Sequence, residues 1–133
     1  MVDNVATVEQ MYADFAAGDV AALLAVFDDR IEWHNAEGHP YLDDTPSTVG
    51  PQQVVDHVLA RIPRDFDRFT VHPDRIVGLD DTVLAEGRYT ATGKATALSL
   101  DVKVANIWDF EDGKVVRWQE YVDPGRFRTV LGL

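Results

Sequence analysis

The sequence predicts an α+β domain in which a cone-shaped, curved antiparallel sheet packs against three N-terminal helices. Apolar residues recur at helical spacing mainly in the first half of the chain. Two-residue alternation, interrupted by turn residues, dominates the second half. Helices that precede an antiparallel sheet cover one of its faces, and a strongly curved sheet facing them can enclose a cavity. The 133 residues suit a single domain, residues 1–133, with a substantial core.

Three helices are expected from the apolar stripes. The first covers about residues 4–17. The second begins at Asp19, a favourable N-cap residue, and its stripe runs to Phe27. The third starts at Pro51, which suits the first turn of a helix, and stops at Pro63.

Between the second and third helices, residues 30–35 alternate and predict a short strand. Residues 36–50 follow and are rich in Gly, Pro, Asp, Ser and Thr, which indicates a loop. A loop of this length is uncommon in a compact domain and is often functional when ordered. We therefore expect it to lie over the mouth of a cavity, with His39 and Tyr41 as contacts to a ligand.

The second half predicts a meander of four strands. They are expected at residues 69–79, 82–92, 98–110 and 115–122. Pro73 should break or bulge the first of them, because proline cannot donate to a strand ladder. The pair Asp112-Gly113 is a strong hairpin signal between the last two. Pro124-Gly125 should end the sheet, and residues 126–133 should form a short helix or tail.

Composition argues against several classes of partner. The 12 basic and 23 acidic side chains give a net charge of −11, a field that repels a phosphate backbone and argues against nucleic acid. No apolar run is long enough to predict a helix in a membrane, and the N-terminal segment lacks the features of a secretory signal. The absence of cysteine excludes disulfides and thiolate chemistry and fits a cytoplasmic protein.

Four segments, in order along nearly the whole chain, resemble a known superfamily. They read YADFAAGDVAALLAVFDD, IEWHNAEGHPY, TVGPQQVVDHV and VANIWDFEDGKVVRWQEYVDP. They are similar to SnoaL-like domains of the nuclear-transport-factor-two-like superfamily, which includes ketosteroid isomerases, limonene epoxide hydrolases, polyketide cyclases and non-catalytic modules. The resemblance implies a conical α+β fold, usually a homodimer, with an apolar pocket between helices and sheet. It does not specify a reaction, which has to be argued from the site.

Compared with the ketosteroid isomerases, the sequence differs at three catalytic positions. Their general base, an aspartate at the end of the first strand, corresponds to Asn35, and an amide cannot take a proton from carbon at neutral pH. The tyrosine of their oxyanion hole corresponds to Met11, with Tyr12 one residue away, and their second oxyanion acid falls near Asn106. These differences argue against ordinary steroid isomerase chemistry.

The limonene epoxide hydrolases match better at the two ends of the chain. The tyrosine and asparagine that hold their attacking water correspond to Trp33 and Asn35. The acid of their last strand corresponds to Glu120, whereas their central arginine and aspartate are replaced by Gly87 and Tyr89. A water-activating pair of Asn35 and Glu120 could therefore remain, with a different mechanism.

Strand alternation gives Ile31, Trp33 and Asn35 one face and His34 the other. The resemblance directs Trp33 and Asn35 inward, so His34 points outward unless a bulge turns it. Polyketide cyclases of this type use an aspartate or a histidine in the cavity as acid/base. Glu120 is the nearest catalytic candidate, and His34 is a second because imidazole titrates near neutral pH.

Glu120 is the main candidate for proton transfer. Enclosed beside Trp118 and Asn35 it would lose hydration, and its pKa would rise into the range that suits a general acid/base. The alternative is a glutamate at the edge of the sheet that pairs with Arg88 or Arg126.

Further positions are expected to line a pocket. Each tryptophan taken alone is explained by core packing, but several aromatic residues around few polar groups suit a small apolar ligand. The expected ligand-binding residues are Met11, Trp33, His39, Tyr41, Tyr89, Asn106, Trp108 and Trp118. His57 and His72 do not form a ligand-spaced cluster, so neither a metal site nor a cofactor is expected.

The sequence therefore predicts a pocket for a small hydrophobic, oxygen-bearing molecule. It favours a cofactor-independent isomerase, cyclase or hydrolase in which Glu120 moves a proton and Asn35 orients a water or a carbonyl. A homodimer without nucleic-acid or membrane partners is expected. The alternative, favoured by the residues at positions Met11 and Asn35, is a non-catalytic ligand-binding or dimerisation module of the same fold.

Overall fold

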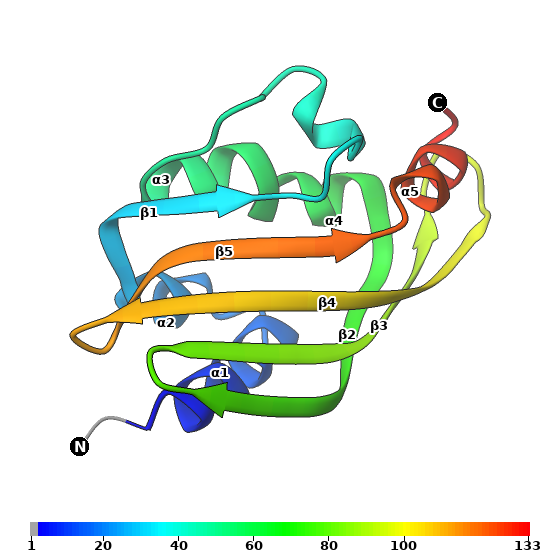
Figure 1. Cartoon of the computed structure of the whole chain (residues 1–133). Coiled ribbons are helices and arrows are strands. Elements are labelled where there is room, and N and C mark those ends of the chain that lie inside the picture. The colour runs from blue at the N-terminus through cyan, green and yellow to red at the C-terminus, as the bar shows by residue number, and fades with distance from the viewer. Residues whose placement is uncertain (1–2) are drawn as a thin grey trace.

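Five strands form one curved sheet, and helices pack against one of its faces (Figure 1). The computed structural model describes residues 3–133. The strands are β1 (Phe27–His34), β2 (Phe66–Leu79), β3 (Thr82–Gly93), β4 (Ser99–Glu111) and β5 (Lys114–Val122). Their order across the sheet is β1-β5-β4-β3-β2. The predicted α+β class is confirmed, and the curved sheet stays open because β1 and β2 lie at its two edges.

The sequence predicts an antiparallel sheet, but the sheet is mixed. The strands β2 to β5 are antiparallel neighbours, but β1 pairs with β5 in parallel, so that Trp33 stands opposite Trp118. The chain leaves β1, passes through helices, and enters the sheet again at its far edge with β2. Because β2 runs opposite to β1 and the meander then reverses at each turn, β5 returns in the direction of β1.

The helices are short and lie before, between and after the strands. They are α1 (Asn4–Ala16), α2 (Val20–Ala25), α3 (Pro51–Val54), α4 (Arg61–Asp65) and α5 (Pro124–Leu131). One π-helical turn, Val55–Leu59, joins α3 to α4, and a 3-10 turn, Pro40–Leu42, lies in the long loop after β1. The side chains of Asp3 and Asp19 accept hydrogen bonds from backbone N–H groups of α1 and α2, which the helices leave unpaired. Among the described residues no helix is long and apolar enough to cross a membrane.

Two predicted boundaries are wrong at helix ends. The second helix ends at Ala25, and β1 begins at Phe27, which pairs with Val115 of β5. The third helical segment continues past Pro63 to Asp65. Proline is tolerated there because it falls in the first turn of α4, where backbone N–H groups have no partner within the helix.

Two further prolines mark the start of a helix and a shift in strand register. Pro124 and Gly125, expected only to end the sheet, begin α5, because the side chain of Asp123 accepts the backbone N–H of Gly125 at 2.9 Å and proline suits the first helical turn. The strand β2 begins at Phe66, earlier than predicted. Its register shifts directly after Pro73, as predicted.

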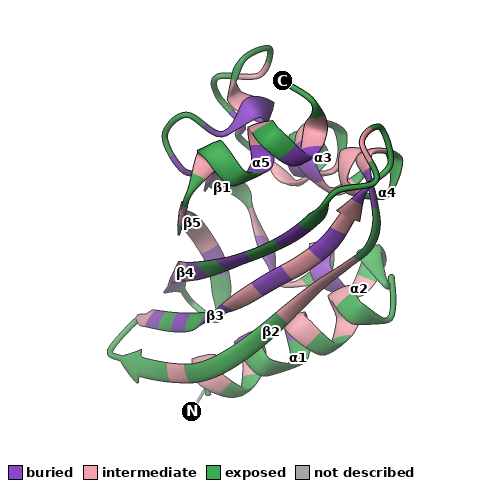
Figure 2. Ribbon diagram, turned by 90° about the vertical axis from the view of Figure 1, so that its right-hand side faces the viewer, coloured by how far each residue is buried: buried purple, intermediate pink, exposed green. Residues whose placement is uncertain are grey.

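The core lies between the concave face of the sheet and the helices (Figure 2). Every second residue of β3 and β4 is buried, which turns one face of each strand toward the helices. Val8 and Met11 of α1 pack in this layer with Ile31 of β1. A second buried cluster includes Phe127 of α5, which closes the end of the layer. This arrangement places the concave face of the sheet around the candidate site.

Candidate functional site

A cavity of about 80 Å³ lies between the concave face of the sheet and the helices. Its wall includes residues of α1, the loop after β1, the strands and α5, with Met11 among them. The volume is about half of the roughly 150 Å³ of an engineered protein cavity that binds benzene. The cavity therefore has little free space in this conformation, and a ring-sized ligand would fit better after side chains move.

Three tryptophans from neighbouring strands form one wall of this cavity. Trp33, Trp118 and Trp108 stand opposite one another across β1, β5 and β4. The rings of Trp33 and Trp118 are stacked with centroids 4.0 Å apart, and Trp108 lies 5.9 and 6.2 Å from them. The indole N–H groups of Trp33 and Trp118 are buried and have no acceptor among the described residues. The structure thus brings these predicted residues together and leaves two donors unpaired.

Glu120 is buried on the concave face of β5, with only 3% of its surface exposed. Its Oε1 accepts hydrogen bonds from Nδ2 of Asn35 and from the backbone N–H of Ala36, each at 3.2 Å. Its Oε2 accepts from the hydroxyl of Tyr89 at 2.9 Å. Burial raises the pKa of Glu120 above 4.5, and the three hydrogen bonds oppose this shift only in part. Glu120 is therefore protonated more easily than an exposed glutamate.

The alternative prediction, an arginine partner for Glu120, is wrong. Nε of Arg88 binds Oδ1 of Asp101 at 2.7 Å, and Nη1 of Arg126 donates to the backbone oxygen of the same residue at 3.5 Å. The hydrogen-bond partners of Glu120 among the described residues are all neutral. A buried carboxyl group without a cation is costly to ionise, and perturbed groups of this kind are candidates for acid/base chemistry.

A chain of hydrogen bonds continues from Glu120 to α1. The hydroxyl of Tyr89 also lies 3.3 Å from Oδ1 of Asn106, and Nδ2 of Asn106 donates to the hydroxyl of Tyr12 at 3.2 Å. Nε1 of Trp108 donates to the same Tyr12 oxygen at 3.3 Å. Burial raises the pKa of both tyrosines, and the nearby Glu120 charge raises the pKa of Tyr89 further. Both hydroxyl groups are therefore neutral at ordinary pH.

Tyr12 is the member of this chain that the sequence comparison missed. The family alignment directs attention to Met11, which also lines the cavity. A signal was nevertheless available, because Tyr12 follows Val8 by four residues and so shares the inward stripe of α1. The stripe is wide enough for both neighbouring side chains to reach the cavity.

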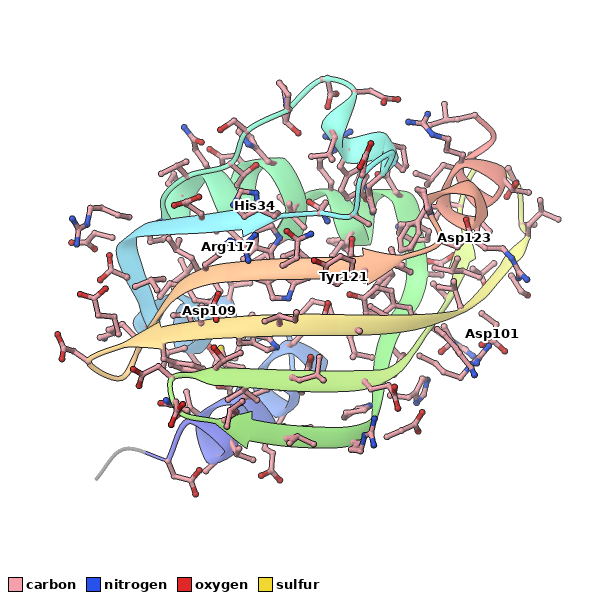
Figure 3. All side chains as sticks on the ribbon, in the orientation of Figure 1. His34, Asp101, Asp109, Arg117, Tyr121 and Asp123 are labelled. Atoms are coloured by element: carbon pink, nitrogen blue, oxygen red, sulfur yellow. The ribbon has the colours of Figure 1, made fainter. Side chains whose placement is uncertain are left out.

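His34 lies outside the cavity, on the solvent face of β1 (Figure 3). Its Nε2 is 3.1 Å from Oε1 of Glu32, and 42% of its side chain is exposed. The pairing of β1 with β5 is regular through Trp33 and His34, so no bulge turns the ring inward. This placement separates His34 from Glu120 and corrects its inclusion among the catalytic candidates.

The loop after β1 folds over the cavity, and His39 and Tyr41 both line it. Nδ1 of His39 accepts the backbone N–H of Tyr41 at 3.1 Å, so the ring hydrogen of the neutral form lies on Nε2. Burial, reinforced by the charges of Arg61 and Arg128, lowers the pKa of His39 to about 4. Its ring packs against Tyr41 and Phe127 with centroids 4.9 and 4.5 Å apart. His39 is thus an uncharged part of the wall at neutral pH.

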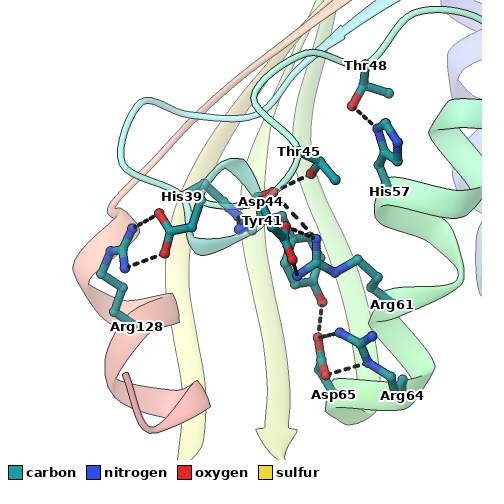
Figure 4. Close-up of polar contacts among 11 residues, drawn as sticks. His39, Tyr41, Asp44, Thr45, Thr48, His57, Arg61, Arg64, Asp65 and Arg128 are labelled. Carbon is teal, nitrogen blue, oxygen red and sulfur yellow. Dashed lines mark hydrogen bonds and ion pairs between the residues drawn. The ribbon is translucent and has the colours of Figure 1, made fainter.

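Arg61 of α4 and Arg128 of α5 form ionic contacts with this loop (Figure 4). Nη1 and Nη2 of Arg128 in α5 contact the two carboxylate oxygens of Asp43 at 3.0 and 2.7 Å. Nη1 of Arg61 in α4 binds Oδ1 of Asp44 at 2.8 Å, and its guanidinium lies 4.1 Å from the centre of the Tyr41 ring. The loop is therefore held over the cavity by ionic contacts, which salt weakens.

The remaining histidines make local contacts. A ring nitrogen of His57 lies 2.9 Å from the hydroxyl of Thr48, and one of His72 lies 2.8 Å from the hydroxyl of Thr90. In residues 3–133 no three side chains of His, Cys, Asp or Glu are grouped so that they could hold a metal ion.

A family model and several solved structures are similar to this chain. A family model described as SnoaL-like domain matches residues 8–118. An NTF2-like protein from Burkholderia thailandensis is 27% identical over 98% of each chain, with a TM-score of 0.90. TerC, co-crystallised with polyporic acid, is 19% identical over 98% of each chain, with a TM-score of 0.83. A candidate SnoaL-like polyketide cyclase from Jannaschia is 17% identical over 96% of this chain and 90% of the other, with a TM-score of 0.81. No curated protein matches this chain.

Proposed function

Because this chain belongs to the SnoaL-like domain family, we propose that its cavity binds a small apolar molecule bearing a carbonyl or hydroxyl oxygen, with which Glu120 exchanges a proton. The observation that carries the proposal is the Glu120 carboxyl group, buried beside an aromatic wall and held only by neutral donors. Such a group suits general acid or base catalysis. The reaction class is an isomerisation, cyclisation or hydrolysis that needs no cofactor.

Tyr12 supplies a complementary group in this proposal. Its oxygen accepts hydrogen bonds from Asn106 and Trp108, and its own hydroxyl hydrogen has no acceptor in residues 3–133. That hydrogen is available to a ligand oxygen, and it would stabilise negative charge that develops there. The contacts support this role for Tyr12 rather than for the aligned Met11.

Asn35 is a positioning residue for the proton-transferring group. Its Nδ2 donates to Oε1 of Glu120 and so fixes the direction of the carboxyl group. The side-chain oxygen Oδ1 of Asn35 accepts no hydrogen bond from the described part of the chain, and it is free to orient a water or a ligand hydroxyl. Asn35 therefore keeps the orienting role expected from the sequence without acting as a base.

The cavity volume restricts the size of the ligand. At about 80 Å³ the cavity in this conformation is too small for a fused multi-ring molecule, so we propose a small ligand or an opening of the wall. Phe15 and Leu59 are partly buried residues of that wall, and their rotation would enlarge it. The relative TerC was co-crystallised with polyporic acid, which supports an organic ligand for this fold.

Two measurements test the proposal. Mass spectrometry of molecules that co-purify with the native protein identifies the ligand, and its conversion is then followed with wild type, Glu120→Gln and Asn35→Ala. We expect conversion to disappear in Glu120→Gln and to fall strongly in Asn35→Ala. His34→Gln is the matched control on the outer face of β1 and should behave as wild type. Undiminished conversion by Glu120→Gln would exclude proton transfer by this residue.

A second candidate function is ligand binding without catalysis. It is favoured by Asn35, which replaces the base of the related isomerases, and by the loop fastened over the cavity. In this case Glu120→Gln would bind the co-purified ligand with unchanged affinity, and the wild-type protein would not convert it. The conversion assay, together with a binding titration of wild type and Glu120→Gln, therefore separates the two functions.

We also propose a homodimer formed through the outer face of the sheet. Leu84 and Tyr121 are 37% and 58% exposed on that face, and Ile107 of β4 stands opposite Leu84. Sedimentation velocity should give the mass of two chains for wild type and of one chain for Tyr121→Asp. Leu98→Asp, an exposed position just before β4, is the control and should remain dimeric.

A further inference from the structure

The Tyr89 hydroxyl carries one hydrogen but has two acceptors within reach. Oε2 of Glu120 lies 2.9 Å from the Tyr89 hydroxyl oxygen, and Oδ1 of Asn106 lies 3.3 Å from the same oxygen. One hydroxyl hydrogen makes one good hydrogen bond at a time. The acceptor that it takes therefore depends on whether Glu120 carries a proton.

The two protonation states of Glu120 give two arrangements. When Glu120 is ionised, Tyr89 donates to Oε2, and Oδ1 of Asn106 receives no hydrogen from the described residues. When Oε2 carries a proton, that proton is donated to the Tyr89 oxygen, and the Tyr89 hydrogen turns to Oδ1 of Asn106. In both states Oε1 of Glu120 keeps its donors, Asn35 and the backbone of Ala36. Only the protonated state gives Oδ1 of Asn106 a hydrogen-bond donor.

The same switch reaches Tyr12 through the amide of Asn106. Nδ2 of this amide donates to the Tyr12 oxygen at 3.2 Å. An amide whose oxygen accepts a hydrogen bond becomes a stronger donor at nitrogen, and successive hydrogen bonds strengthen one another by roughly 10–30% per bond. A phenol oxygen that accepts a stronger bond becomes a better donor through its own hydrogen. The free hydrogen of Tyr12 therefore binds a ligand oxygen more strongly when Glu120 is protonated.

We propose that Tyr89 and Asn106 are positioning residues that couple the proton on Glu120 to the hydrogen-bond donor strength of Tyr12. The catalytic consequence rests on the proposed function, whereas the switch is a property of the protein without ligand. If Glu120 removes a proton from a carbon next to a ligand carbonyl, the C–H electron pair moves toward the carbonyl oxygen. The same proton turns Tyr89 toward Asn106 and strengthens Tyr12 as a donor to that oxygen. Charge formation and its stabilisation are thus coupled in one step.

The groups that face Glu120 leave it as the titrating member of this network. Tyr89 from β3 and Tyr12 from α1 have raised pKa values and stay neutral. His39 from the loop after β1 has a pKa lowered to about 4 and is neutral where Glu120 titrates above 4.5. The segment after β1 and the strand β4 contribute amides, and α5 contributes a phenylalanine. No charged side chain contacts Glu120 in the part of the chain that the structure describes.

The first test follows Tyr12 in the wild-type protein without ligand. Tyrosine labelled with ¹³C at Cζ is observed by NMR across pH, with Tyr12 assigned from Tyr12→Phe, and the Glu120 carboxyl carbon is followed in parallel. We expect the Tyr12 signal to shift at the pH at which Glu120 titrates, and this inflection to be lost in Asn106→Leu. A Tyr12 signal that is constant through the Glu120 titration overturns the proposal. Because this test needs only wild type and Tyr12→Phe, it stands even if the Asn106 variant does not fold.

The second test uses opposite shifts at neighbouring positions. Tyr89→Phe removes a donor to the ionised carboxylate, so the pKa of Glu120 should rise above its wild-type value. Asn106→Leu removes an acceptor that is used only in the protonated state, so the pKa of Glu120 should fall. Trp108→Phe removes the other hydrogen bond to Tyr12 and lies outside the switch, so it should leave the pKa of Glu120 unchanged. Shifts in the same direction for Tyr89→Phe and Asn106→Leu would contradict the switch. Neither test depends on turnover, so their failure is distinct from failure of the proposed function.

Discussion

Asn35, directly after β1, stands beside Glu120 of the parallel strand β5, and Nδ2 of Asn35 donates to Oε1 of Glu120 at 3.2 Å. The parallel register of β1 and β5 sets Trp33 opposite Trp118, so the polar residues two positions further along the chain from each tryptophan also meet. An antiparallel pair would have carried Asn35 and Glu120 in opposite directions from the tryptophans. The direction of one edge strand therefore assembles the polar end of the cavity.

Replacing Glu120 should change how stability depends on pH. Burial raises the folded-state pKa of Glu120 above 4.5, so between 4.5 and the raised value the folded protein holds a proton that the unfolded chain has released. Stability from this group falls as pH rises through that window. In Glu120→Gln the titration is absent, so the variant's free energy of unfolding relative to wild type should increase across the window by up to about 1.4 kcal/mol per pH unit. Urea denaturation at a series of pH values measures this difference, and a difference independent of pH would contradict the raised pKa.

Replacing His39 should remove a pH dependence of the opposite sign. The pKa of His39 is lowered from 6.5 to about 4, so between these values the unfolded chain takes up a proton that the folded protein does not. Stability is therefore lost as pH falls from 6.5 to about 4, by about 3 kcal/mol in total. His39→Asn keeps an acceptor for the backbone N–H of Tyr41 and does not titrate. The Tm of His39→Asn should depend less on pH than the Tm of wild type over this range. An unchanged dependence would show that the fold does not lower the pKa of His39.

Removing the Tyr12 hydroxyl should affect both stability and ligand binding. Tyr12→Phe leaves the buried donors of Asn106 and Trp108 without their acceptor, which should reduce the free energy of unfolding by about 1–3 kcal/mol. It should also weaken binding of the co-purified ligand by roughly tenfold, the value of one neutral hydrogen bond. Denaturation and calorimetric titration measure the two effects. Tyr121→Phe, on the exposed outer face, is the matched control, and equal losses in both variants would argue against a specific role for Tyr12.

Releasing one arginine contact should loosen the loop over the cavity. Arg128→Gln removes the paired contacts to Asp43 and weakens the contact to the backbone of Gly38. We expect faster hydrogen–deuterium exchange in residues 38–45 and faster release of a bound ligand. Arg126 in the same helix contacts Asp101 and not the loop. In Arg126→Gln, hydrogen–deuterium exchange in the loop should therefore match that of wild type. Protection that is unchanged in Arg128→Gln would show that this ion pair does not hold the loop.

The residues that share a strand face could be predicted from the sequence because alternation along a strand is local, and the family resemblance indicated which face points inward. A period of two is enough to put Trp33 with Asn35 on one face and His34 on the other, and the structure has this arrangement. The same rule groups Trp118 with Glu120. These assignments needed no knowledge of which strands are neighbours.

The features that the sequence did not predict depend on distant parts of the chain. The parallel pairing of β1 with β5 follows from the path of the whole meander, and no local pattern encodes it. The contact of Tyr12 with Asn106 depends on the rotation of α1 against the sheet, which is set by packing. The ion pair of Asp43 with Arg128 joins exposed charges that are 85 residues apart, and exposed charges carry no periodic signal.

The tryptophan wall also gives the protein an optical property. The chain has three tryptophans, and Trp33, Trp108 and Trp118 all border the cavity. Its entire indole emission therefore originates beside the candidate site, with no tryptophan elsewhere to dilute a change. Any molecule that enters displaces or contacts these rings, so candidate compounds can be screened by intrinsic fluorescence without a label or a known reaction.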